Sequence, residues 1–174
     1  MKTSFEITGL QETLQLFQDL EGEIGDKRAR SKVLIPAVKE AMKPVLSMAK
    51  GLSPKDTGLL AQSLITVARR PTNKDKKSKY INNSDSAIAI VTTKPIPKKL
   101  KQQSSGMSRG EKKKFYASKG SLYDARAIAN EFGTAKMAAN PFMRVSLESQ
   151  AALVATKLGE IIKQKIEKYR SKSL

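Results

Sequence analysis

The stretch "ARAIANEFGTAKMAANPFMRVSLES", Ala125 to Ser149, joins two segments with different apolar patterns. Its first eight residues alternate, with Ile128 and Phe132 on the same side, which predicts a strand. Gly133 permits a backbone geometry closed to other residues, so it can end that strand. Asn140 followed by Pro141 is typical of a helix start, because Asn accepts a hydrogen bond from first-turn amides and Pro has no amide to leave unpaired. We therefore expect a strand-to-helix corner.

The helix predicted after this corner carries the longest amphipathic pattern in the chain, from Met143 to Ile166. Two other helical patterns lie near the N-terminus, one over 10–24 and a longer one over 34–52. Pro36 is tolerable in a first turn, whereas Pro44 lies inside the longer pattern and removes one backbone hydrogen bond, so we expect a kink, or a helix that starts after Pro36.

Alternating residues predict strands over 63–68 and 86–93, and the short stretch "SFEIT" near the N-terminus is either a strand or a lead-in. The connection between 69 and 85 is polar and typical of a hairpin with a long, mobile tip. Together these elements predict an α+β fold in one domain, 1–174. We expect an antiparallel sheet of about three to four strands, packed against two N-terminal helices and a long C-terminal helix.

Charge is concentrated in the middle of the chain. The 174 residues include 33 basic and 16 acidic ones, a net charge of +17. Residues 69–119 hold 15 of the basic and 3 of the acidic residues, which leaves +12 there. Such a balance favours a polyanion, an acidic protein surface or a membrane headgroup layer as a neighbour.

Residues 95–120 show neither a sustained helical nor a strand period and are interpreted as a flexible basic insertion. A solvated mobile loop and a contact to phosphates through counterion release both remain open. Sequence-specific readout is not supported, since no helix-turn-helix or finger spacing appears. The residues proposed to contact DNA or an acidic partner are Lys98, Lys99, Lys101, Arg109, Lys112, Lys113 and Lys114.

Several chemistries lack their usual residues. The chain has no cysteine and no histidine, which removes disulfides, thiolate nucleophiles and ordinary zinc sites. No metal or cofactor is expected. No run approaches the roughly 18 apolar residues of a membrane span, so no membrane-spanning segment is expected. A membrane headgroup layer is compatible with the charge, but a membrane is not among the partners that we expect.

Acid–base catalysis would need paired carboxylates, and the candidates are Glu131 with Asp124 or Glu148. Asp124 would share a strand face with Arg126, which offers a plain salt bridge instead. We predict that the protein is not an enzyme. The corner by itself does not require Glu131, which leaves a local salt bridge or a contact to a neighbouring copy as its role.

Three short motifs, in order, resemble the tail-completion family of long-tailed bacteriophages, also called minor neck or head–tail joining proteins. That family shows a P-x-D-T-G-x-L turn, then E-F-G-T, then P-F-hydrophobic-R-P-A before a last helix. Val145 and Ser146 stand where the family more often has Pro-Ala. The matching residues are Pro54, Asp56, Thr57, Gly58 and Leu60, then Glu131 to Thr134, then Pro141, Phe142, Met143 and Arg144.

The resemblance implies a structural protein of the virion, in the neck or at the tail tip facing the head, assembled in the host cytoplasm. Copies would form a ring, expected to be a hexamer, between the head connector and the tail terminator, with DNA passing through. The basic region would face that DNA or an acidic neighbouring protein. A free nonspecific nucleic-acid-binding protein is the alternative. The expected interface residues are Glu131, Phe132, Gly133, Thr134, Phe142 and Arg144.

Overall fold

A computed structural model describes residues 10–55, 58–78, 81–121 and 125–173. The chain divides into two compact units, which are described separately. Unit 1 comprises Met1–Pro44, Thr66–Ile90 and Gln150–Leu174, and unit 2 comprises Val45–Ile65 and Val91–Ser149. The expectation of a single domain stays a prediction. In the described residues, every helix is too short or too polar to cross a bilayer.

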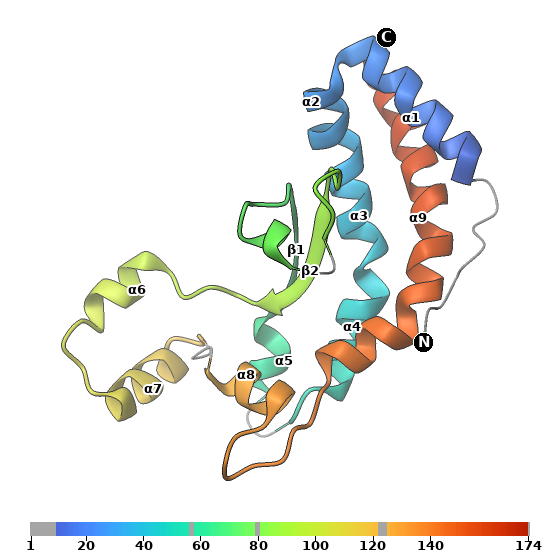
Figure 1. The fold of residues 1–174 in the computed structure, drawn as a ribbon. Helices are drawn as coiled ribbons and strands as arrows, with labels where there is room; N and C mark the ends of the chain where they lie inside the picture. Colours follow the sequence, from blue (N-terminus) through green and yellow to red (C-terminus); the bar gives the residue numbers. More distant parts are fainter. Residues whose placement is uncertain (1–9, 56–57, 79–80, 122–124, 174) are drawn as a thin grey trace. The chain divides into compact units, whose positions relative to one another are not determined.

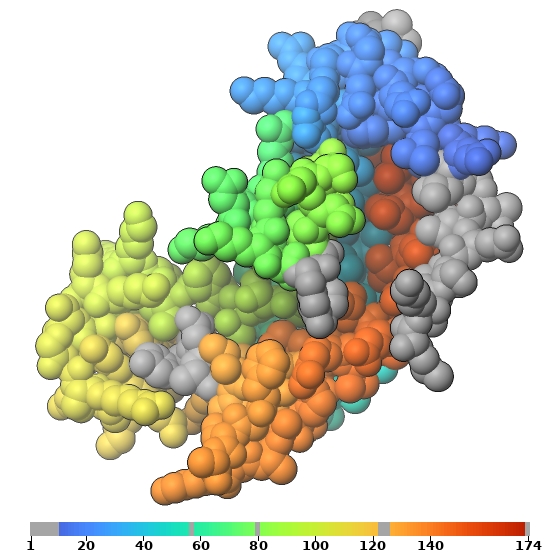
Figure 2. Space-filling model, in the orientation of Figure 1, coloured from blue at the N-terminus to red at the C-terminus, as the bar shows by residue number. Residues whose placement is uncertain are grey.

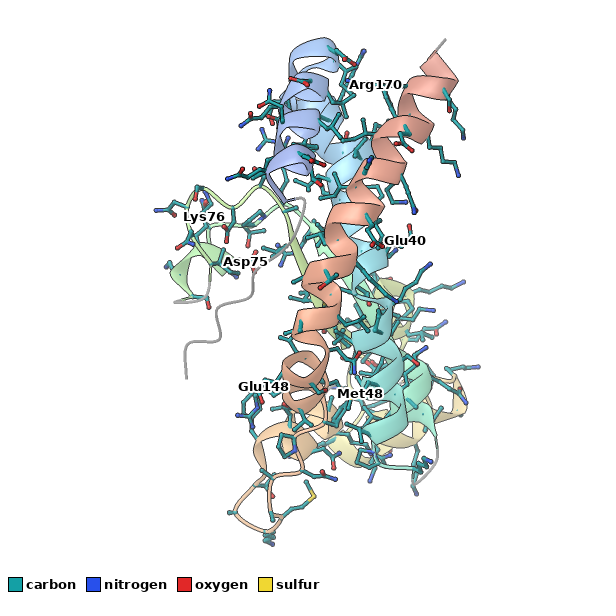
Figure 3. The ribbon with its side chains drawn as sticks, turned by 90° about the vertical axis from the view of Figure 1, so that its right-hand side faces the viewer. Glu40, Met48, Asp75, Lys76, Glu148 and Arg170 are labelled. Atoms are coloured by element: carbon teal, nitrogen blue, oxygen red, sulfur yellow. The ribbon has the colours of Figure 1, made fainter. Side chains whose placement is uncertain are left out.

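Unit 1 is built from helices that lie side by side in Figures 1 and 3. They are α1 (Leu10–Ile24), α2 (Asp26–Ala29), a π-helical turn (Arg30–Leu34), α3 (Ile35–Ala41) and the part of α9 (Met143–Ser173) that begins at Gln150. The core of unit 1 consists of Leu20, Ala29, Val33, Ala37, Ile162 and Ile166.

Small residues and two ion pairs bring the unit 1 helices together. A Cβ added at Gly159 would lie 3.5 Å from the Thr13 hydroxyl, so α1 approaches α9 closely there. Lys165 on α9 pairs with Glu40 on α3 at 2.7 Å, and Figure 3 shows Glu40 beside α9. Arg170, near the end of α9, pairs with Glu23 of α1 at 2.6 Å. These contacts hold the long C-terminal helix against the N-terminal helices, as expected.

The long N-terminal pattern is interrupted at Met42, where α3 ends and α4 (Lys43–Leu52) begins. Pro36 and Pro44 are each the second residue of the helix that contains them. A proline is tolerated at such a position because first-turn amides have no partner within the helix. The helical pattern is thus interrupted at Met42, close to Pro44, whereas the alternative of a helix start after Pro36 is not found, because α3 begins at Ile35.

Two strands, β1 (Leu64–Arg69) and β2 (Ile88–Thr93), form an antiparallel sheet and confirm two of the expected strands. The connection between them includes a short 3₁₀ helix, Asp75–Lys77. Arg69 holds Asp75 through two hydrogen bonds, of 2.5 and 3.0 Å, and the Asp75 carboxylate also accepts from Thr72. The "SFEIT" stretch lies outside the described residues.

Unit 2 contains α4 from Val45, α5 (Leu59–Ser63), α6 (Lys98–Gln103), α7 (Arg109–Ser118), α8 (Ala125–Phe132) and the first turns of α9. The expected strand over 125–132 was wrong, because that segment is α8. Ile128 and Phe132 are four residues apart, a spacing that fits a helix face as well as a strand face. Among the described residues the sheet thus has two strands rather than three or four. The core of unit 2 consists of Ala49, Leu60, Leu64, Ala127 and Phe142.

Candidate functional site

The Glu131 carboxylate, on α8, caps the first turn of α9. One carboxylate oxygen accepts the backbone N–H groups of Phe142 and Met143 at 3.0 and 2.9 Å, and the other accepts that of Arg144 at 3.1 Å. These donors would otherwise be unsatisfied at a helix start. The sequence assigned this role to Asn140, which is exposed and lies before the helix. A carboxylate distant in sequence therefore replaces the local cap.

Arg144 completes the contact from the other side. Its Nε donates to the Glu131 carboxylate and its Nη2 donates to the Glu131 backbone carbonyl, each at 3.0 Å. Glu131 is only 3% exposed. A carboxylate buried to this degree is stable when several donors surround it.

The hydrogen bonds decide the charge state of Glu131. Burial raises the pKa of its carboxyl, but the backbone amides of Met143 and Arg144, the Arg144 guanidinium and the Phe142 amide together outweigh this effect. The net pKa lies below the ordinary value of a glutamate. Glu131 is thus an ionised structural anion rather than a proton donor, and the salt-bridge role weighed from the sequence describes it better than a catalytic one.

Gly133 shapes the chain between α8 and α9. It has a φ of +75°, and a Cβ there would lie 2.9 Å from the backbone atoms Ala139 N and Met137 O. Thr134 and Met137 exchange backbone hydrogen bonds of 2.8 and 3.2 Å, which close a turn. The Asn140 N–H donates to the Asn130 carbonyl at 2.7 Å. Figure 1 shows this segment extending away from both helices. Its geometry confirms a glycine-dependent corner, although a helix rather than a strand enters it.

The two phenylalanines of the corner have opposite environments. Phe142 is 1% exposed and belongs to the core of unit 2. Phe132 is 66% exposed, and the Arg144 guanidinium lies 5.2 Å from its ring centroid. Ile128, one turn earlier on α8, is 59% exposed. Phe142 is therefore a core residue, whereas Ile128 and Phe132 form an exposed apolar face, hereafter the α8 face.

The sequence did not identify Ile128 as a surface residue, because the predicted strand only placed it on the same side as Phe132. The signal that identifies the α8 face is the four-residue spacing of large apolar residues in an alanine-rich segment, which favours a helix. The first family motif is only partly described, since Asp56 and Thr57 lie outside the described residues. Gly58 (φ +69°) precedes α5, and Leu60 is buried in the core of unit 2.

The basic segment forms a hairpin of two helices, α6 and α7, hereafter the basic hairpin. Ser108 and Glu111 form a reciprocal cap at the start of α7, and the buried hydroxyls of Ser104 and Tyr116 lie 2.5 Å apart. The expectation of no regular structure here was wrong, because these local contacts stabilise two short helices. Whether the hairpin is flexible stays a prediction.

The cationic candidates all lie on this hairpin, whose atoms are yellow in Figure 2. Within the described residues, none of their side chains forms an ion pair, and the one acid of the hairpin, Glu111, bonds to Ser108. Lys112 is half-buried, and the exposed candidates are Lys98, Lys99, Lys101, Arg109, Lys113 and Lys114. The hairpin is thus a cationic surface on which Glu111 is the one carboxylate of the described residues 98–118.

Comparison of the chain with family models, with curated proteins and with solved structures gives no match. Among the described residues, no cluster of three or more acidic side chains could hold a metal ion. The candidate functional surfaces are therefore the α8 face, with the corner behind it, and the basic hairpin.

Proposed function

We propose that the protein is a structural component of a long-tailed phage neck, a tail-completion protein that joins the tail to the head connector. The observation that carries this proposal is the construction of the corner from Glu131 to Arg144. The buried Glu131 carboxylate holds the corner through hydrogen bonds to the Phe142 amide and to Arg144. On its outer side, the exposed Phe132 ring lies beside the Arg144 guanidinium.

Such an arrangement suits binding between protein surfaces. Aromatic residues and arginine are enriched in interfaces and supply many of the residues that dominate binding energy. A rigid corner also lowers the entropy lost when the surface is covered. The order of the three family motifs along the chain agrees with this reading.

Assembly as a ring, expected to be a hexamer, requires that one surface of each copy contact a different surface of the next. We assign the α8 face to one side of this contact. Phe132 and Arg144 would then touch a neighbouring copy, the head connector or the tail terminator, while Glu131, Gly133 and Phe142 support the surface from within. Thr134, in the turn, is exposed at its margin.

The test is complementation of a phage deleted for this gene, with electron microscopy of the particles. The Phe132→Ala variant is expected to leave heads and tails unjoined while the purified protein keeps its circular dichroism spectrum. Leu14→Ala is the matched control, because Leu14 is 51% exposed on α1 in unit 1. Normal joining by Phe132→Ala would remove the α8 face from the interface.

The basic hairpin supports a second function, nonspecific binding of nucleic acid, either within the neck or by the free protein. Binding through phosphates weakens steeply as salt rises, with a slope set by the number of phosphates neutralised. Replacing Lys98, Lys99, Lys113 and Lys114 by Gln keeps the buried residues of the hairpin. Particles that still join heads to tails would show that the charges are dispensable for assembly, whereas a joint loss of DNA binding and function would favour the nucleic-acid alternative.

A further inference from the structure

Unit 2 contains a cavity of about 300 Å³ at the base of the basic hairpin. Its walls come from the end of α5, the chain leaving β2, the first turn of α6 and the end of α7. The described lining residues contain no Asp or Glu. The lining residues with polar side chains are Gln62, Ser63, Lys94, Lys119 and Ser121.

Two lysines therefore line one cavity without a carboxylate in its described wall. Neither Lys94 nor Lys119 forms an ion pair within the described part of the chain. Like charges around a hollow reinforce each other, because the low-dielectric walls concentrate their field. The charge of the described wall therefore favours an anion over a cation as a ligand of the cavity.

The backbone at both lysines is fixed by hydrogen bonds. The Lys94 N–H donates to the Ser63 carbonyl at 2.7 Å, and the Lys119 N–H donates to the Tyr116 carbonyl at 3.1 Å. Gly120, with a φ of +64°, follows α7, and the Ser121 N–H then donates to the Tyr116 carbonyl at 2.8 Å. The two exposed lysines are therefore attached to hydrogen-bonded backbone on opposite arms of the hairpin.

The donors of this cavity match a dianion. Lys94 and Lys119 carry two positive charges, which balance the charge of a dianion, and Gln62 and Ser121 bring neutral donor groups to the same wall. A volume of about 300 Å³ equals roughly ten waters at about 30 Å³ each, so a tetrahedral oxyanion fits with part of its hydration. The described wall has no aromatic ring on which a nucleobase could stack.

We propose that the cavity binds a phosphate group between Lys94 and Lys119. The bound group bridges the arm that enters the basic hairpin and the arm that leaves it, so phosphate binding also stabilises the hairpin against local opening. Binding of phosphate by the isolated protein does not depend on assembly into a phage neck. The phosphate comes either from the free ion or from a nucleic-acid backbone.

The experiment titrates the full-length protein with sodium phosphate by isothermal calorimetry, at an ionic strength held constant with sodium chloride. The wild-type protein is expected to bind phosphate saturably. The Lys94→Gln/Lys119→Gln variant is expected to bind at least about tenfold more weakly, which is about 1.4 kcal/mol. Lys99→Gln/Lys113→Gln is the matched control, because it removes the same charge from exposed positions outside the cavity.

Equal weakening in both double variants, or no saturable binding by the wild-type protein, overturns the proposal. Lys94→Arg/Lys119→Arg should restore binding and guards against an effect of misfolding. A 12-base-pair DNA duplex is the second probe. A greater loss of duplex binding for the Lys94/Lys119 pair than for the control pair identifies the nucleic-acid backbone as the phosphate source, and equal losses identify the free ion. A hexaglutamate peptide that binds the cavity more tightly than phosphate overturns it in favour of a carboxylate ligand.

Discussion

Glu131 and Arg144 hold each other through both side chain and backbone. The Glu131 carboxylate accepts the backbone N–H and the Nε of Arg144, while the Glu131 carbonyl accepts the Arg144 Nη2, all at 3.0 to 3.1 Å. Because the same guanidinium lies beside the Phe132 ring, this pair links the start of α9 to the α8 face. The stability of unit 2 and its proposed binding surface therefore share one contact.

Replacing Glu131 by Ala is expected to destabilise the protein by about 2 kcal/mol or more. The change leaves three backbone donors of the first turn of α9 without the acceptor that they have now, and the loss of a helix cap alone costs about 0.5–2 kcal/mol. Urea unfolding followed by circular dichroism measures the difference. Glu148→Ala, at an exposed position of α9, should stay within about 0.5 kcal/mol of wild type. Equal stability of the two variants would show that the cap contributes little.

Acid should weaken the Glu131 contact. The folded-state pKa of Glu131 lies below its ordinary value of 4.5, so its ionised form stabilises the protein at pH values above that value. This contribution is lost as the pH falls through the folded-state pKa. The free-energy difference between wild type and Glu131→Gln, measured in urea from pH 7 down to pH 3, is expected to shrink toward the acid end. A difference that stays constant with pH would mean that the carboxylate charge has no part in the cap.

Much of the helical framework was readable from the sequence, because apolar residues recur with helical spacing in the segments that became α1, α3, α4 and α9. The corner was only half readable. The turn at Gly133 was predictable because glycine favours a positive φ, whereas the cap on α9 comes from Glu131, a residue distant in sequence from the helix start. Pairings of this kind are set by tertiary packing and leave no local pattern.

The α8 segment shows where periodicity is ambiguous. Ile128 and Phe132 lie on one side in both a helix and a strand, and eight residues are too few for the two periods to separate clearly. The basic hairpin was missed for a different reason. Its helices are polar, and contacts such as Ser104 with Tyr116 define them where an apolar stripe is absent.

Gly133→Ala is expected to cost more stability than Gly120→Ala. Both glycines follow the end of a helix with a positive φ, +75° and +64°, so both substitutions impose the strain of a left-handed backbone, about 1–2 kcal/mol. Only at Gly133 would the new Cβ also meet backbone atoms at 2.9 Å, whereas Gly120 has no heavy atom of the described chain within 4 Å of that position. Thermal unfolding of the two variants separates steric contact from backbone strain. Identical losses would contradict the close approach between Gly133 and the segment at Ala139.

Tyr116→Phe is expected to loosen the basic hairpin. The Tyr116 hydroxyl lies 2.5 Å from the Ser104 hydroxyl, which also bonds to the Lys101 carbonyl at 3.0 Å, and Tyr116→Phe removes the Ser104–Tyr116 hydrogen bond. A buried hydrogen bond of this kind contributes about 1 kcal/mol, which corresponds to roughly a fivefold rise in local opening. Amide hydrogen exchange of α6 and α7, read by mass spectrometry, measures that opening. Phe115→Leu, at the half-buried neighbouring position, serves as the control for lost aromatic contact. Unchanged exchange in Tyr116→Phe, or the same rise in Phe115→Leu, would show that the hairpin is held by packing rather than by the Ser104–Tyr116 hydrogen bond.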